Sequence, residues 1–302
     1  MSVVNLESII KDLESRGLVI KDQEEFEYYV KNFNVNTFIA EYSDFFENDE
    51  HKFDQVNAND IIKLYQFDKN LGNHIFREIL VIEKIINTNV VIETINYYNI
   101  EDKCMLKLEP NVLQNSILRN LDKVEPYTEY RSFLYKITKY MDGNKVTKKY
   151  LDMANHDDIF KWANTPLDVM CLTWSFATTF SFLIASSHEV REIVLKNFKI
   201  DYLHWHGFVD FVKNLINIRN HISHNIVVYD TPVKYVSNEL MSLYSSIFNE
   251  NVDVRRFKLI HIIRMIDYFA NSKNLFTKTV QFGKSMNVAE PYRTKIAKLF
   301  EL

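Results

Sequence analysis

Glycine and proline are scarce in this chain, with five of each among 302 residues. β-Sandwiches and barrels need many turns that depend on these two residues, so their scarcity favours helices. The stretch from residue 60 to residue 98 contains one glycine, Gly72, and no proline. It predicts one long helix, or two end to end, in an all-α protein. The residues that follow one side of this helix are Ile61, Leu64, Tyr65, Asp68, Leu71, Ile75, Ile79, Ile82 and Ile86.

Shorter helices are expected on both sides of that stretch. The spacing of the apolar residues between Leu6 and Leu13 predicts a first helix, which Gly17 ends. Asp22 and Glu25 have the spacing of a capping box that opens a second helix. Three helices are expected in the last part of the chain, at 232–248, 253–270 and 290–302.

An apolar run from Leu167 to Ala185 is about as long as a membrane-spanning helix. Thr165-Pro166 precedes it as a helix start, because a capping residue is followed by proline in the first turn. The run contains Asp168 and several serines and threonines, and no lysine or arginine lies directly beside it. These features favour a helix buried in the protein core over a membrane span.

The cysteines and the first residues of the chain indicate the cellular compartment in which the protein is expected. Cys104 and Cys171 lack the spacing of a redox or zinc motif and suit a reducing environment rather than a disulfide framework. The first residues do not form a basic segment followed by an apolar run, so no signal peptide is expected. Together these features predict a cytoplasmic protein.

The net charge of −4 does not by itself favour a nucleic-acid-binding protein, because such proteins usually carry excess positive charge. Two stretches are nevertheless basic and can contact RNA phosphates. Alternatively, each is a solvated helix face whose charge is balanced by acids elsewhere. The candidate phosphate contacts are Arg131, Lys136, Lys139, Lys145, Lys148 and Lys149 in the first stretch, and Arg255, Arg256 and Lys258 in the second.

A short motif, Arg219-Asn220 followed by His224, brings reactive groups together in the sequence. RNA carries its own nucleophile in the 2′-hydroxyl, and a histidine can remove that proton or protonate the 5′-oxygen that leaves. An arginine can bind the non-bridging oxygens and stabilise the charge that develops on phosphorus. Neither task needs a metal, so the motif is a candidate site for metal-independent RNA cleavage with a 2′,3′-cyclic phosphate product.

Two other interpretations of the motif are open at this point. In the first, Asn220 and His224 cap backbone groups at a helix end, and Arg219 pairs with an acid. In the second, His221 and His224 bind a metal ion, although no carboxylate or cysteine completes a ligand set. On an ideal helix Arg219 lies about 140° from His224, so one helix does not clamp a small ligand between them.

Three blocks of this sequence resemble bacterial abortive-infection proteins of the AbiD/AbiF type, which belong to the HEPN superfamily of helical ribonucleases. The first block is Leu13–Ile20, and the second is Ile61–Leu71, which continues into Ile82–Ile85. The third is the apolar helix from Pro166, followed later by the Arg219 motif. The order and spacing of these blocks are more specific than the motif alone.

The resemblance implies an all-α fold and a defence function. Its core would be a HEPN-type helical bundle over residues 59–230, with helical extensions over 1–58 and 231–302. The implied function is a toxin-like endoribonuclease that halts growth during phage infection, without a metal or another cofactor. Some members of the group lie beside a structured non-coding RNA, so an RNA partner is also implied. The alternative is a module that holds such an RNA, or a protein partner, without cutting.

The implied site is composite, because Arg219 and His224 of two protomers of a homodimer would face each other. The resemblance also implies that Glu83, in the second block, orients a catalytic group or pairs with its charge. Alternatively, Glu83 is an acid on the helix surface. The resulting set of catalytic candidates is Arg219, Asn220, His224 and Glu83.

Overall fold

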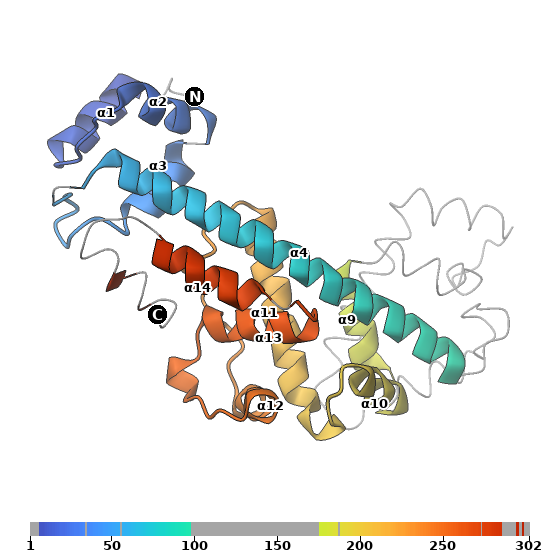
Figure 1. The fold of residues 1–302 in the computed structure, drawn as a ribbon. Coiled ribbons are helices and arrows are strands. Elements are labelled where there is room, and N and C mark those ends of the chain that lie inside the picture. The colour runs from blue at the N-terminus through green and yellow to red at the C-terminus, as the bar shows by residue number, and fades with distance from the viewer. Residues whose placement is uncertain are drawn as a thin grey trace, which may run out of the picture. The chain divides into compact units, whose positions relative to one another are not determined.

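The computed structural model describes residues 6–33, 35–54, 56–97, 175–186, 188–272, 274–285, 294–295 and 298. Within these ranges the chain is all-helical, as predicted, and β-type pairing is limited to two isolated bridges (Figure 1). The elements are α1 (Leu6–Ser15), α2 (Gln23–Asn32), α3 (Val35–Ser43), α4 (Ala58–Tyr97), α9 (Phe176–Ala185), α10 (His188–Asn197), η3 (Tyr202–His204), α11 (Trp205–Ser223), α12 (Asn238–Phe248), η4 (Val254–Arg256), α13 (Leu259–Phe269) and α14 (Leu275–Ser285).

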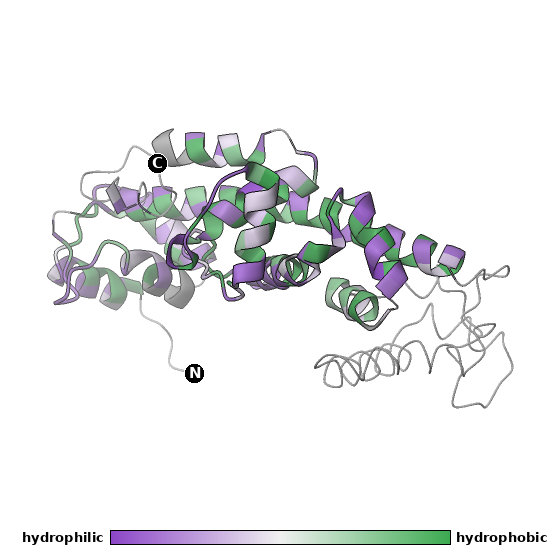
Figure 2. Cartoon of the chain, turned by 90° about the horizontal axis from the view of Figure 1, so that it is seen from below, coloured by the Kyte–Doolittle hydropathy of each residue, from purple (hydrophilic) through white to green (hydrophobic). Residues whose placement is uncertain are grey.

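The helices expected from apolar periodicity are present in the first third of the chain. α1 is followed by Gly17 in a left-handed conformation, with φ of 97°. Asp22 caps α2, and its side chain accepts a hydrogen bond from the Glu25 N–H at 2.9 Å. The predicted long helix is a single element, α4. Many helices carry both apolar and polar residues, as expected of helices with one buried face (Figure 2).

Several predicted helices begin later than expected. The run predicted as one helix from Thr165-Pro166 to Ala185 is helical at its end, where α9 lies. It is not one continuous helix, because Ser175 is extended and caps α9 through a hydrogen bond from the Thr178 N–H. The helix predicted from residue 232 begins at Asn238, and the one predicted from 253 begins at Leu259. α3, α10 and α14 were not predicted, and most of the helix expected at 290–302 lies outside the described residues.

α12 starts late because side chains of α11 bind the backbone that precedes it. Asn214 is buried there, donates from Nδ2 to the Tyr235 carbonyl at 2.8 Å and accepts from the Tyr235 N–H at 3.2 Å. Ser237 then caps α12: its Oγ accepts from the Leu240 N–H and donates to Asp210 at 2.6 Å. The backbone before Asn238 is thus hydrogen-bonded to α11 side chains, which compete with a helical turn.

The helices group into two compact units, each assembled from separate parts of the chain. The first unit comprises residues 1–79, 217–234 and 255–302, and the second comprises 80–216 and 235–254. α4 and α11 each contribute to both units. The predicted domain limits at residues 58 and 230 are not tested by this grouping and stay a prediction.

An aromatic cluster fills the core of the first unit. The Tyr65 ring of α4 lies 5.1 Å from that of Phe33, 5.3 Å from that of Phe38 and 5.3 Å from that of Tyr42, measured between centroids. Aromatic pairs at this spacing contribute stability beyond their buried area. The cluster thereby attaches the short helices α2 and α3 to α4.

In the second unit, α11 and α12 approach closely at Gly207. A Cβ atom at this position would overlap the backbone carbonyl of Glu239, which cannot move away as a flexible side chain can. Glycine is therefore required here for helix packing.

We expect Gly207→Ala to lower the free energy of unfolding by roughly 1–3 kcal/mol, because the backbone must shift to admit the methyl group. Gly72→Ala is a matched control, since a Cβ there meets only side-chain atoms of Val228 and Ile222. Urea denaturation of both variants measures the difference. A Gly207→Ala protein as stable as the wild type would contradict the close approach of the helices.

Candidate functional site

The Arg219–His224 motif lies at the C-terminal end of α11, where the helix closes in a Schellman turn. Asn225 adopts a left-handed φ of 59°. Its N–H donates to the Ile222 carbonyl at 3.0 Å, and the N–H of Ile226 donates to the His221 carbonyl at 2.9 Å. These are the two backbone hydrogen bonds that define this turn. The backbone alone therefore terminates the helix.

The side chains of Asn220 and His224 take no part in that termination. Asn220 and His224 are exposed, and neither side chain makes a hydrogen bond to any residue that the structure describes. Arg219 is partly buried. The capping role considered for Asn220 and His224 is therefore wrong, because the helix ends without them.

A buried aspartate on α4 holds the segment that follows the motif. Asp68 accepts hydrogen bonds from the N–H groups of Val228 and Tyr229 at 2.8 and 2.7 Å, and from the Tyr42 hydroxyl at 2.7 Å. Burial raises the pKa of Asp68, and these hydrogen bonds oppose the rise by stabilising the carboxylate. One carboxyl group thus connects α3, α4 and the chain after α11.

Lys69, the next residue on α4, reaches the left-handed turn itself. Its ammonium donates to the Asn225 carbonyl at 3.3 Å and lies 3.7 Å from Asp68. It also lies over the rings of Tyr42 and Tyr65, at 5.7 and 5.4 Å from their centroids. Burial lowers the pKa of Lys69, and the nearby Asp68 opposes this change. α4 therefore fixes both the end of α11 and the backbone beyond it.

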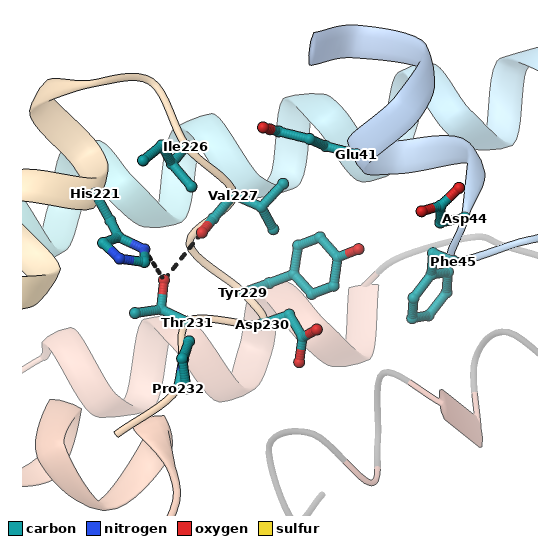
Figure 3. Close-up of a pocket in the computed structure, with 10 residues that line it drawn as sticks. All are labelled: Glu41, Asp44, Phe45, His221, Ile226, Val227, Tyr229, Asp230, Thr231 and Pro232. Carbon is teal, nitrogen blue, oxygen red and sulfur yellow. Dashed lines mark hydrogen bonds between the residues drawn. The ribbon is translucent and has the colours of Figure 1, made fainter. Parts of the chain in front are cut away.

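An open cavity of about 430 Å³ lies beside this segment (Figure 3). Nδ1 of His221 lies 3.4 Å from Oγ1 of Thr231, whose hydroxyl donates to the Val227 carbonyl at 2.9 Å. The residues that line the cavity are Glu41, Asp44, Phe45, His221, Ile226, Val227, Tyr229, Asp230, Thr231 and Pro232.

The cavity combines carboxyl groups with an imidazole. Burial raises the pKa of Glu41 and that of Asp230. Burial also lowers the pKa of His221, and the positive charge of Lys234 adds to this effect. At neutral pH the cavity therefore presents a mostly neutral imidazole beside acidic side chains.

The sequence model of the Abi-like proteins matches residues 28–230, which is more than half of the chain. The chain belongs to the Abi-like family. This membership confirms the part of the resemblance that assigns the chain to an abortive-infection family. The match includes the motif, Asp68 and the segment that Asp68 holds. Neither the curated proteins nor the solved structures compared with the chain give a match.

The structure brings some predicted catalytic residues of this Abi-like protein together. Arg219, Asn220 and His224 lie within one helix end of the first unit. Glu83 is partly buried on α4 in the part that belongs to the second unit, so its role beside the motif stays a prediction. His221, which lines the cavity, was considered only as a metal ligand; its spacing of three from His224 was the available signal.

The predicted RNA contacts are described only in part. The first basic stretch, Arg131–Lys149, lies outside the described residues. Arg255 and Arg256 are exposed at η4. Lys258 instead donates from its ammonium to the Lys298 carbonyl at 2.8 Å. Contact of these residues with RNA stays a prediction.

Two interpretations left open by the sequence, a membrane-spanning helix and a metal site, concern residues that the structure describes in part. α9, the described part of the apolar run, has ten residues. Among the described helices of this Abi-like protein, none is long and apolar enough to cross a membrane. Among the described side chains, no three histidines, cysteines or acids are grouped to hold a metal ion.

We expect Asp68→Ala to destabilise the protein by about 2–4 kcal/mol, because the buried N–H groups of Val228 and Tyr229 lose their acceptor. Asp68→Asn is the matched control and should cost less, since its amide oxygen can still accept. Urea denaturation gives the stability, and hydrogen exchange at the two amides tests the cause. Equal stability and equal amide protection in both variants would contradict the role of Asp68.

Proposed function

We propose that this Abi-like protein is a metal-independent endoribonuclease that acts in anti-phage abortive infection. The end of α11 carries the proposal. The backbone turn at Asn225 terminates the helix, so the exposed side chains of Asn220 and His224 are available to a substrate. Exposed reactive residues at a rigidly held chain segment are typical of catalytic sites.

The proposed chemistry uses the 2′-hydroxyl of RNA as the nucleophile. His224 transfers a proton at the reacting oxygens, and Arg219 binds the non-bridging oxygens of the scissile phosphate. Asn220 adds an amide that can hydrogen-bond the substrate. No metal ion is required, and the products are a 2′,3′-cyclic phosphate and a 5′-hydroxyl.

In this proposal the protein is an AbiD/AbiF-type member of the HEPN superfamily and works as a homodimer. Arg219 lies about 140° around α11 from His224, so a single helix does not direct both side chains to one phosphate. Two helix ends that face each other would supply Arg219 from one protomer and His224 from its partner. A structured RNA is the expected partner, either as the substrate or as the molecule that restrains the activity.

The wild type should cleave RNA in the presence of EDTA, whereas His224→Ala should lower kcat by about 10²–10⁴-fold, because a positioned proton donor or acceptor is lost. The measurement is gel analysis of a labelled RNA, with end-group analysis of the products. His206→Ala is the matched control, since His206 is an exposed histidine near the other end of α11.

Two results of that assay would overturn the proposal. Cleavage that needs a divalent metal, or that continues in His224→Ala, would exclude the proposed mechanism. RNA that stays intact while it binds both proteins, with an affinity that falls steeply with salt, would identify a non-cleaving RNA-binding module instead.

A composite site predicts that two inactive variants complement each other. Arg219→Ala and His224→Ala are each expected to be inactive alone, but co-expression should restore measurable cleavage. A mixed dimer would contain one site with an intact arginine from one protomer and an intact histidine from its partner. The same RNA assay on the co-purified mixed dimer measures this, and no recovery would contradict a site shared in this way.

A further inference from the structure

His221 lies in the last turn of α11, and its hydrogen bond with Thr231 indicates which ring nitrogen carries the proton. Thr231 donates its hydroxyl proton to the Val227 carbonyl at 2.9 Å, so its oxygen can only accept from the His221 Nδ1 atom 3.4 Å away (Figure 3). The neutral ring therefore carries its proton on Nδ1, and Nε2 carries a lone pair.

This arrangement is that of a general base. A histidine acts as a base when one nitrogen is held by a hydrogen bond and the other is available to a substrate proton. Nε2 of His221 makes no hydrogen bond to any residue within the described ranges. The ring also lines the cavity of about 430 Å³, so there is space beside it for part of a nucleotide.

His221 and His224 share one face of the helix end. The N–H of His224 donates to the Asn220 carbonyl at 3.0 Å, so the helical register continues to His224. Residues three apart on a helix are neighbours, with Cβ atoms about 5–6 Å apart. The two imidazoles can therefore reach two oxygens of one phosphodiester group.

On the basis of the proposed ribonuclease function, we infer that His221 is the general base and His224 the general acid of RNA cleavage. Nε2 of His221 takes the 2′-hydroxyl proton while O2′ forms a bond to phosphorus. His224 gives a proton to O5′ while the P–O5′ bond breaks. One proton is taken and one is given, and exchange with water restores both histidines. Arg219 stabilises the charge on the non-bridging oxygens.

The charged groups around His221 set the pH range of this chemistry. Glu41, Asp44 and Asp230 line the same cavity, and Lys234 follows in the chain after it. Burial first, and Lys234 second, lower the pKa of His221 below its usual value of 6.5. A base becomes active as pH rises through its pKa, so the rising limb of the rate profile should lie below pH 6.5.

A ribo-oligonucleotide with sulfur in place of the bridging 5′-oxygen separates the base from the acid. The sulfur is placed at the bond that the wild type cuts, and it leaves as a thiolate without a proton. His224→Ala should be slow on ordinary RNA and regain its rate on the sulfur substrate. His221→Asn should be slowed by about 10²–10⁴-fold on both substrates and should lose the rising limb of the pH profile.

The variants are chosen to keep the fold. The amide of His221→Asn can still donate to Thr231, and His206→Asn is the control for an exposed histidine on the same helix. Thermal melting checks that each variant is folded. If the wild type cuts and His221→Asn keeps its rate and rising limb, or is rescued by sulfur, this inference alone is overturned. If the folded wild type leaves both substrates intact, the ribonuclease proposal itself fails, and this inference with it.

Discussion

The hydrogen bonds to the buried carboxyl group of Asp68 hold together the part of the first unit that carries the Arg219–His224 motif. A carboxylate buried this deeply is unfavourable unless donors surround it, and here two backbone N–H groups and the Tyr42 hydroxyl do so. Those donors come from different parts of the chain, so satisfying one buried charge fixes α3 and the segment after α11 on α4. Lys69 extends the network to Asn225. Networks of this kind specify one arrangement because a partly satisfied alternative is costly.

The proposed chemistry follows from that arrangement. Because the chain after Ser223 is held from α4, the end of α11 is a defined structure in which the backbone satisfies itself through Asn225. Asn220 and His224 are thereby left without a structural task, and Thr231 is placed where it can orient His221. The same fixed segment forms a wall of the cavity. The structural carboxylate of Asp68 and the proposed site of proton transfer are thus linked through a few residues of backbone.

Apolar periodicity was sufficient for elements whose burial repeats along one face. α4 is the strongest example, since a 3.6-residue repeat over its whole length leaves no competing structure. The same reasoning failed where side chains from elsewhere hold the backbone. A helix was predicted from residue 232, but Asn214 and Asp210 bind the chain before Asn238. Likewise, Ser175 provides a cap inside an apolar run that appeared continuous.

The sequence by itself determined the helical class, the long helix α4 and the motif residues Arg219, Asn220 and His224, because these depend on local spacing and side-chain chemistry. The tertiary structure decided the role of Asp68, which in sequence is a single polar residue on an apolar face. It also placed the hydroxyl of Thr231 beside His221, since Thr231 lies beyond the helix end. Both features depend on hydrogen bonds that reach beyond a single helix, and no local pattern specifies which buried donor meets which acceptor.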